Sequence, residues 1–396
     1  MLDGVTDPSW LRQIKDLFQE ALDAQPPRDS PMRARLLAQL AVNLGWTSTA
    51  ESIALSDAAL AMAERLDDRR SIIDALRSQQ ISRGGPDGVR ERLDIGNRMV
   101  RIGLADADDS STLWGHLWRF DAFLQLGEIA NAEAELPGLD RLAQRLRSPL
   151  AAWHAVRARS VITLAYGDFE RSSALGAELA FLARRSGSTV SSLGYLALLG
   201  AQTGRWSAAS DERIDSVADG PPALLTLRAS LLLKLGRRDT AEHLYRSMPP
   251  LASARGFMLM STLSAAALLA AEFDDRSLAA DVHRRLHPYR DLFVTGGAGA
   301  VAVLGSARLH IGIAARTLGR FDEAVGHLRR AVEANDAAGM APMATRARLE
   351  LAVALARRAR TGDRDEATAL ATSVAVQAGE LGMEPLRLRS ADLAAR

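Results

Sequence analysis

A short motif recurs along the chain and constrains its fold more than any other feature of the sequence. Each copy ends an apolar segment with a glycine, continues through a few polar residues, and opens the next segment with an alanine at a fixed offset. Helices commonly end on a residue with positive φ, which glycine adopts without a steric penalty, so each glycine is expected to end a helix. The motif glycines are Gly127, Gly167, Gly204, Gly236, Gly319 and Gly362.

The spacing of these glycines is typical of a helical-hairpin repeat. Those from Gly127 to Gly236 are 40, 37 and 32 residues apart, and the last two are 43 apart. The 83-residue gap before Gly319 accommodates two units, and turns at Leu44-Gly45 and 83–88 mark two earlier ones. A single hairpin cannot bury its own apolar stripe, so the units must stack on one another.

The segment 319–339 shows such a stripe. Its apolar residues recur at the i, i+3, i+4, i+7 spacing of a helix with one buried face, and they are Phe321, Ala324, Val325, Leu328, Ala331 and Val332. Few runs are rich in β-branched or aromatic residues, and aromatic residues are only 5% of the chain, so little material remains for a sheet. The predicted fold class is all-α, a tetratricopeptide-like right-handed superhelical solenoid of about nine helical hairpins.

We divide the chain into a leading helix and linker (1–27), a continuous helical-repeat array (28–382) and a C-terminal tail (383–396). The leading helix is predicted at about 8–24. First helices of the hairpins are predicted at 31–45, 70–83, 111–126, 149–166, 188–203, 221–235, 254–272, 299–318 and 341–360. Second helices are predicted at 49–67, 89–103, 128–147, 168–186, 205–217, 237–248, 275–289, 320–339 and 363–382.

Charge and cysteine content exclude several classes of function. The 49 basic and 48 acidic residues nearly cancel, and no basic block is present, so direct nucleic-acid binding is not expected. The absence of cysteine excludes disulfides, thiol nucleophiles and thiolate metal sites. The N-terminus lacks the apolar core of a signal peptide, and no apolar run is long enough to span a bilayer. We therefore expect a cytoplasmic protein that does not contact membranes.

Several stretches carry a family resemblance. The runs at 51–68 (ESIALSDAALAMAERLDD), 117–175, 287–340 and 367–383 resemble the helical-repeat sensor region of MalT-like bacterial signal-transduction ATPases, which include LuxR-type regulators and cyclase-linked ATPases. In that family this region binds inducers or protein partners. The resemblance therefore implies a regulatory scaffold that follows an ATPase.

The chain departs from that family in two respects. It contains no G-x-x-x-x-G-K-[ST], so the ATPase part is missing, and the stretch after Met383 is too short for a DNA-binding domain. The implications for ATP and DNA therefore do not carry over. The chain is either a fragment of a regulator or the product of a gene that keeps only the repeats.

The best candidate binding residues lie on two predicted first helices. Trp114 and Trp118 are one helical turn apart, and aromatic and arginine side chains are what binding hot spots favour. First helices line the concave surface in repeats of this type. The candidate set is Trp114, Trp118, Arg119, Asp121, Trp153, His154 and Arg157. The alternative is that these tryptophans only fill gaps in an alanine-rich core.

Two other patterns point to weaker sites. Residues 297–302 read G-x-G-x-x-A after the apolar run LFVT, which is the form of a dinucleotide fingerprint, but the flanking hairpins supply no parallel sheet. We expect a glycine turn into a helix, whose free amides at Gly297 and Gly299 offer at most a weak anion site. His283 and His287 share a helix face, but no third metal ligand is identifiable in the sequence, so no metal and no cofactor are predicted.

The expected function is binding rather than catalysis. No nucleophile–base pair is identifiable, so no catalytic residue is assigned. The predicted partner is a protein, a peptide or a small-molecule inducer in the concave groove. The alternative is a repurposed enzyme with a pocket between repeats lined by Trp, His and Asp. A structural or homo-oligomerising role is a third hypothesis.

Overall fold

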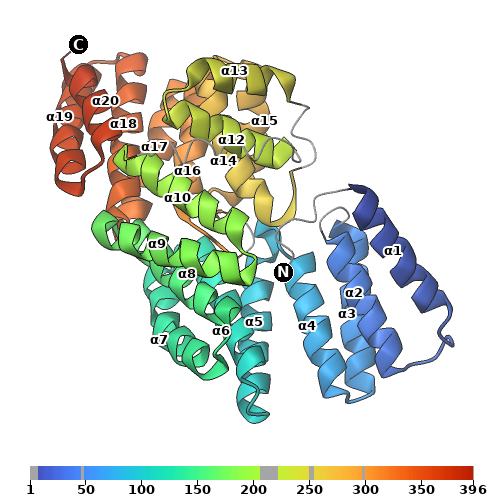
Figure 1. Cartoon of the computed structure of the whole chain (residues 1–396). Coiled ribbons are helices and arrows are strands. Elements are labelled where there is room, and N and C mark those ends of the chain that lie inside the picture. The colour runs from blue at the N-terminus through green and yellow to red at the C-terminus, as the bar shows by residue number, and fades with distance from the viewer. Residues whose placement is uncertain (1–7, 46–48, 206–221, 249–253, 297–298, 396) are drawn as a thin grey trace.

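The computed structural model describes residues 8–45, 49–205, 222–248, 254–296 and 299–395, and helices dominate throughout (Figure 1). The helices are α1 (Pro8–Asp23), α2 (Pro31–Leu44), α3 (Thr49–Arg65), α4 (Arg69–Ser82), α5 (Val89–Ala105), α6 (Asp109–Leu126), α7 (Ile129–Leu146), α8 (Pro149–Tyr166), α9 (Phe169–Ser186), α10 (Thr189–Thr203), α12 (Pro222–Lys234), α13 (Arg238–Ser247), α14 (Leu259–Glu272), α15 (Arg276–Leu286), α16 (Ala307–Thr317), α17 (Phe321–Ala337), α18 (Ala341–Arg358), α19 (Asp363–Leu381) and α20 (Glu384–Ala394). The other elements are the 3-10 turns η1 (Pro86–Gly88), η3 (Gly256–Met258) and η4 (His287–Tyr289) and the strands β1 (Phe293–Thr295) and β2 (Val303–Ser306).

Consecutive helices pack as hairpins, and the hairpins stack into a superhelix (Figure 1). The pairs are α2/α3, α4/α5, α6/α7, α8/α9, α12/α13, α14/α15, α16/α17 and α18/α19. The first helix of the fifth hairpin is α10, while the second helix predicted at 205–217 falls, after Arg205, outside the described residues. The predicted all-α, tetratricopeptide-like solenoid is confirmed.

The turn chemistry predicted from the motif is confirmed. All six motif glycines have φ between +73° and +88°, a region in which other residues are strained. The alanines that open the second helices of three of these units, Ala132, Ala241 and Ala324, are completely buried. Their small side chains let the paired helices cross closely.

One segment departs from the helical pattern. The first helix predicted at 299–318 begins only at Ala307, because the strands β1 and β2 pair as an antiparallel hairpin before it. Phe293 pairs with Ser306 and Thr295 with Val303 across the two strands. Branched apolar residues on both sides of a glycine-containing turn favour this local pairing over a helix. The neighbouring first helix also starts late, at Leu259, after the turn η3.

Repeat units that are far apart in the sequence contact one another. The phenol oxygen of Tyr289 donates to Asp87 Oδ2 at 2.9 Å, across 202 positions of the chain. Helix α20, which lies in the expected C-terminal tail, packs against α10 as well as α19. Figure 1 shows α18–α20 beside α9 and α10 at one end of the molecule. The inner surface is therefore partly enclosed instead of forming an open groove.

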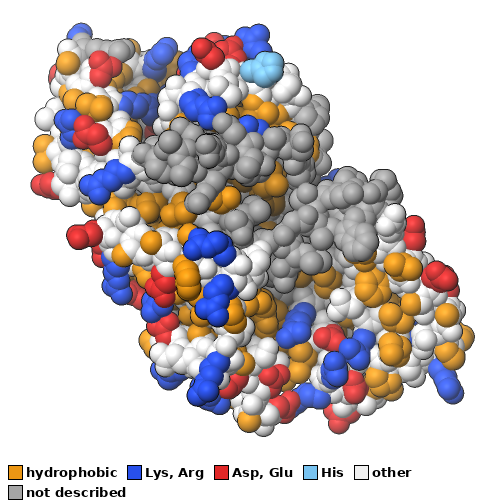
Figure 2. Space-filling model, in the orientation of Figure 1, with side chains coloured by type: hydrophobic (Ala, Val, Ile, Leu, Met, Phe, Trp, Pro, Cys, Tyr) orange, Lys and Arg blue, Asp and Glu red, His pale blue; other side chains and the backbone are white. Residues whose placement is uncertain are grey.

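The surface carries charges of both signs. On the face shown in Figure 2, acidic and basic side chains are interspersed with apolar ones, and no large patch of one sign is present over the described residues. This pattern agrees with the near-zero net charge. Among the described helices, none has both the length and the apolar character needed to cross a bilayer.

Candidate ligand-binding cavity

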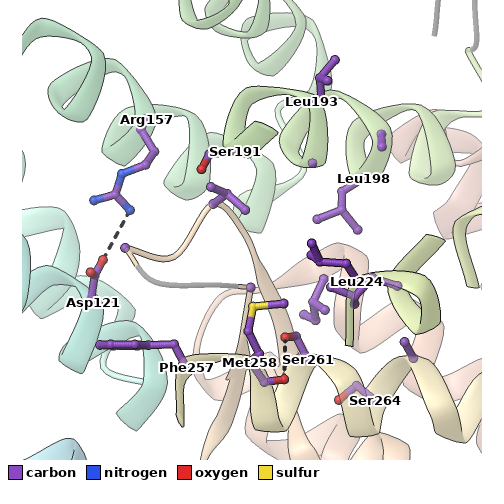
Figure 3. A pocket seen from close by; sticks show the side chains of 18 of the residues that line it. Asp121, Arg157, Ser191, Leu193, Leu198, Leu224, Phe257, Met258, Ser261 and Ser264 are labelled. Carbon is purple, nitrogen blue, oxygen red and sulfur yellow. Dashed lines mark hydrogen bonds and ion pairs between the residues drawn. The ribbon is translucent and has the colours of Figure 1, made fainter. Parts of the chain in front are cut away.

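A cavity of about 380 Å³ lies inside the superhelix. The helices that contribute described residues to its wall are all first helices, namely α4, α6, α8, α10, α12, α14, α16 and α18. The rest of the described wall comes from Ser188, from the end of η3 and from the β-hairpin. The first helices thus form the inner surface, as the repeat pattern predicts. Figure 3 shows side chains from several of these elements converging on one space.

The β-hairpin closes one side of this cavity. Gly296, Gly299, Val301 and Leu304 line it, so the turn projects inward from between α15 and α16. The hairpin is anchored through Phe293 to the turn that follows α6. A Cβ placed on Gly127 would lie only 2.3 Å from the ring of Phe293, so the ring packs directly on the turn that follows α6.

Three tryptophans and one histidine form an aromatic wall. Trp118 and Trp153 are almost completely buried, and Trp114 is partly buried. The ring of His154 lies between those of Trp114 and Trp153, with centroids 5.0 and 4.9 Å away in edge-on geometry. Burial, followed by the charge of Arg157, lowers the pKa of His154 well below its ordinary value. The imidazole is therefore neutral at neutral pH.

Arg157 is the most deeply buried charge in this wall, with an exposed fraction of 1%. Its Nη1 donates to the carbonyl oxygen of Ala300 at 2.7 Å and to Asp121 Oδ1 at 3.4 Å. Figure 3 shows the guanidinium of Arg157 and the carboxylate of Asp121 approaching each other from α8 and α6. Burial lowers the pKa of Arg157, and the nearby Asp121 opposes that change.

Asp121 is also buried, and it faces two arginines. Burial raises the pKa of Asp121, while the charges of Arg157 and Arg92 lower it in part. Arg92 on α5 donates to Gln125, and its guanidinium lies 5.1 Å from the centroid of the Phe257 ring. Burial lowers the pKa of Arg92 to about 10, so it remains charged at neutral pH. Asp121, the carboxylate described on this side of the cavity, therefore lies near two cations, Arg157 and Arg92.

Further basic groups lie across the cavity, on α12, α16 and α18. Lys234, His310 and Arg346 line this side. Burial, and then the charge of Arg346, lower the pKa of Lys234 to about 7. Burial also lowers the pKa of His310 to about 3, so that ring is neutral. Glu350, whose charge acts on Arg346 and His310, is paired with Arg316 at 2.9 Å and with Arg389 at 2.8 Å. The charged groups of the wall are thus mainly cationic.

Several buried polar atoms of the wall have no hydrogen-bond partner among the described residues. Buried polar groups normally have partners, and ordered water or a ligand supplies the missing ones. Two of these atoms, Nε and Nη2, belong to Arg157. The others include Gln80 Oε1, His154 Nδ1, Ser264 Oγ and His310 Nδ1. The cavity therefore offers donors and acceptors to a guest at several points of an otherwise apolar wall.

The structure brings together six of the seven residues predicted to bind a ligand. Trp114, Trp118, Asp121, Trp153, His154 and Arg157 all line the cavity. Arg119 does not. Its guanidinium pairs with Glu135 on α7 at 2.6 Å, because the neighbour of an inward-facing residue on a helix points elsewhere.

The two predicted anion-binding glycines have a different setting from the expected one. Gly299 lies in the β-hairpin turn with φ +84°, not at the start of a helix, so the argument from free helical amides does not hold there. Gly297 lies outside the described residues. The antiparallel pairing of β1 with β2 also excludes the parallel βαβ unit that a dinucleotide fingerprint requires.

His283 and His287 have close neighbours on another helix, which the sequence did not reveal. His283 Nε2 lies 2.7 Å from Glu323 Oε1, and His327 is close to both. His283 comes from α15 and the other two come from α17, 40 or more positions further along the chain. Sequence spacing alone identified no third group beside His283 and His287.

Sequence reasoning also missed part of the cavity wall itself. Phe257, Met258 and Arg346 lie within predicted first helices, but no local pattern marks them as wall residues, and only the superhelical winding brings them to the cavity. Lys234 carried one usable signal. It is one of only two lysines in a chain whose other 47 basic residues are arginine.

No family model and no curated protein matches the chain. Among solved structures it is similar to the crystal structure of yeast Tom70, with a TM-score of 0.31 and 11% identity, covering 97% of this chain and 86% of that chain. It is also similar to a circular tandem repeat protein, with a TM-score of 0.19 and 14% identity, covering 98% and 88%. The resemblance to MalT-like sensor regions stays a prediction, because no family model supports it.

Proposed function

We propose that this protein is a binding protein of the sensor type, and that its ligand is an organic anion with a large apolar part, enclosed in the first-helix cavity. The observation that carries the proposal is Arg157. A buried guanidinium with Nε and Nη2 unpartnered, beside three tryptophans at an apolar cavity, suits a carboxylate or similar acceptor.

The size and lining of the cavity support a small ligand. Its volume of about 380 Å³ falls in the range of typical ligand pockets, which are apolar with a few placed polar groups. Leucines from α10 and α12, such as Leu198 and Leu224, line the cavity together with the tryptophans of α6 and α8. Figure 3 shows the leucines on the opposite side of this space from Arg157 and Asp121.

The charge balance of the wall supports an anion over a cation. Arg157, Lys234 and Arg346 line the cavity, against Asp121 as the acidic residue among the described wall. An anion near these groups gains charge-assisted hydrogen bonds that are roughly twice as strong as neutral ones. A cationic ligand would be repelled by the same groups.

A matched pair of probes tests the proposal. Binding of 2-naphthoate and of the neutral 2-naphthalenemethanol would be followed by quenching of tryptophan fluorescence. We expect the carboxylate to bind about tenfold more tightly than the alcohol, since a hydrogen bond to a charged group contributes about 1.5–3 kcal/mol. In Arg157→Met the two affinities should converge. Equal affinities in the unmodified protein would overturn the proposal.

Arg159→Met is the control variant. Arg159 lies on the same helix, two residues from Arg157, and pairs with Asp140 at 3.6 Å outside the cavity wall. It should keep the preference for the carboxylate. Circular dichroism of both variants checks that a loss of binding is not a loss of fold.

A second candidate function is catalysis in the same cavity. The observation that favours it is Asp121, a buried carboxyl whose pKa is raised by its surroundings, in an enclosed pocket beside aromatic rings. Incubation with a small-molecule extract of the source cells distinguishes the two functions. An enzyme would generate new masses that Asp121→Asn abolishes, whereas a binding protein would retain a ligand that is recovered chemically unchanged.

A further inference from the structure

A second polar cluster lies between α15 and α17, away from the residues that line the cavity. His283 stands on α15 and His287 at the start of η4, while Glu323 and His327 stand on α17. Each pair is four residues apart, so the two side chains of a pair project from one face of their segment. The packing of the hairpins brings these two faces together. No sequence pattern predicts this contact.

The distances between the potential ligand atoms of the cluster are close to those of a metal site. One potential ligand atom from each of His283, Glu323 and His327 lies within 4.8 Å of the other two. His283 Nε2 and His327 Nε2 lie 2.7 and 3.9 Å from the same oxygen, Glu323 Oε1. Bonds of about 2.0 Å to a tetrahedral ion place ligand atoms about 3.3 Å apart, midway between these distances.

His287 lies beside this group, although its ligand atoms are not within 4.8 Å of all the others. Its ring centroid lies 5.7 Å from that of His283 and 5.8 Å from that of His327. The ring of His287 is therefore a neighbour of both histidines in the group formed by His283, Glu323 and His327. Three nitrogen ligands and one carboxylate oxygen form a donor set that suits zinc and its neighbours, and not magnesium or calcium, which prefer oxygen ligands.

The burial and the partners of the cluster agree with metal binding. His327 is largely buried, with 11% of its side chain exposed, and its Nδ1 has no hydrogen-bond partner among the described residues. Arg308, a positive charge that acts on His327, is engaged by Asp291 at 2.5 Å. The neighbouring Arg320 lies 3.6 Å from the second carboxylate oxygen of Glu323, which leaves Oε1 to the histidines.

We propose that His283, Glu323 and His327, with His287 as the fourth ligand, bind one divalent transition-metal ion of the zinc class. The ion links α15 to α17, and so joins one helical hairpin to the next at a point outside the ligand cavity. Its binding energy adds to the stability of the folded chain, because the unfolded chain does not hold the four groups together. This site is independent of the proposed ligand and does not require it.

Cobalt provides the direct test. Full-length protein without an affinity tag, stripped of metal with a chelator, would be titrated with Co²⁺ and followed by the visible absorption of tetrahedral cobalt. We expect saturation at one ion per chain and displacement by Zn²⁺ but not by Mg²⁺. Zn²⁺ should also raise the thermal midpoint of the stripped protein. Absence of a stoichiometric visible band would overturn the proposal.

Variants locate the ion. Glu323→Gln and His327→Ala should each weaken Zn²⁺ binding at least tenfold by calorimetry, and Zn²⁺ should no longer raise their thermal midpoints. His243→Ala, which removes an exposed histidine on α13, is the matched control and should bind as the parent does. Unchanged affinity in both Glu323→Gln and His327→Ala would place any bound ion elsewhere and refute the assignment. Glu323→Gln keeps the side-chain shape, so it remains informative if the alanine variant does not fold.

Discussion

Arg157 on α8 donates a hydrogen bond through Nη1 to the carbonyl oxygen of Ala300, although the two residues are 143 positions apart in the chain. Ala300 belongs to the β-hairpin turn, an element that the repeat does not contain elsewhere in the described chain. A single buried side chain therefore joins the central repeats to an insertion from the C-terminal half. It also holds Asp121 and faces the cavity.

Replacing Arg157 should destabilise the fold through Asp121. In Arg157→Met the buried carboxylate keeps only Arg92 as a nearby cation, and breaking a buried ion pair typically costs about 3–5 kcal/mol. The double variant Arg157→Met/Asp121→Asn should be less destabilised than the sum of the single variants, by about 1–3 kcal/mol. Urea denaturation of the four proteins measures this coupling. Strict additivity would show that the pair does not interact in solution.

Gly127→Ala should cost more than Gly187→Ala. Both glycines end a helix at nearly the same φ, +79° and +78°, so both variants carry the left-handed strain of about 1–2 kcal/mol. Only Gly127 lies against the Phe293 ring, whereas nothing lies within 4 Å of a Cβ on Gly187. Overpacking should add about 1–3 kcal/mol in Gly127→Ala. Equal losses in thermal or urea unfolding would mean that Phe293 does not dock there.

Glu350 should make stability fall in acid. Burial raises the pKa of Glu350, but Arg389, Arg316 and Arg346 outweigh burial and lower it from 4.5 to about 2. A carboxyl with a depressed pKa stabilises the fold above its unfolded pKa, and this contribution is lost as pH falls from about 4.5 toward 2. The difference corresponds to about 3 kcal/mol.

Glu350→Gln tests this effect. The variant should be less stable than the parent at pH 7, and the difference should shrink at pH 3 in urea titrations. Glu380→Gln serves as the control, because Glu380 is exposed on α19 and should show little difference at either pH. A gap between parent and Glu350→Gln that does not change with pH would contradict the charge-based explanation.

Lys234 should make ligand affinity depend on pH near neutrality. Burial, and then Arg346, lower its pKa to about 7, so the ammonium loses its proton as pH rises through that value. Neighbouring His310 is already neutral there, because burial lowers its pKa to about 3. A carboxylate probe stays ionised throughout, so its affinity should fall about tenfold from pH 6 to pH 9. Fluorescence titration of 2-naphthoate into Lys234→Met should give a flat profile. The same slope in the variant would assign the effect to another group.

The repeating part of the fold could be predicted from residues close together in sequence. Gly167 and Gly319 end helices because only glycine adopts their φ without strain. A buried alanine, such as Ala324, recurs at a fixed offset from the motif glycines. Such signals are local, and the helix boundaries follow from them to within a few residues. The β-hairpin escaped this reasoning, since a short apolar run beside glycines has the same pattern whether it continues as a strand or enters a helix.

The sequence alone determined the helical hairpins and their turns, because 3.6-residue periodicity and glycine chemistry act over a few residues. It also placed Trp114, Trp153 and Arg157 on inner helices. Only the tertiary structure decided that the inner surface closes into a cavity, that Ala300 meets Arg157, and that His283 meets His327. Those approaches depend on the accumulated rotation from one hairpin to the next. Small differences in repeat length add up along the superhelix, and no local pattern records their sum.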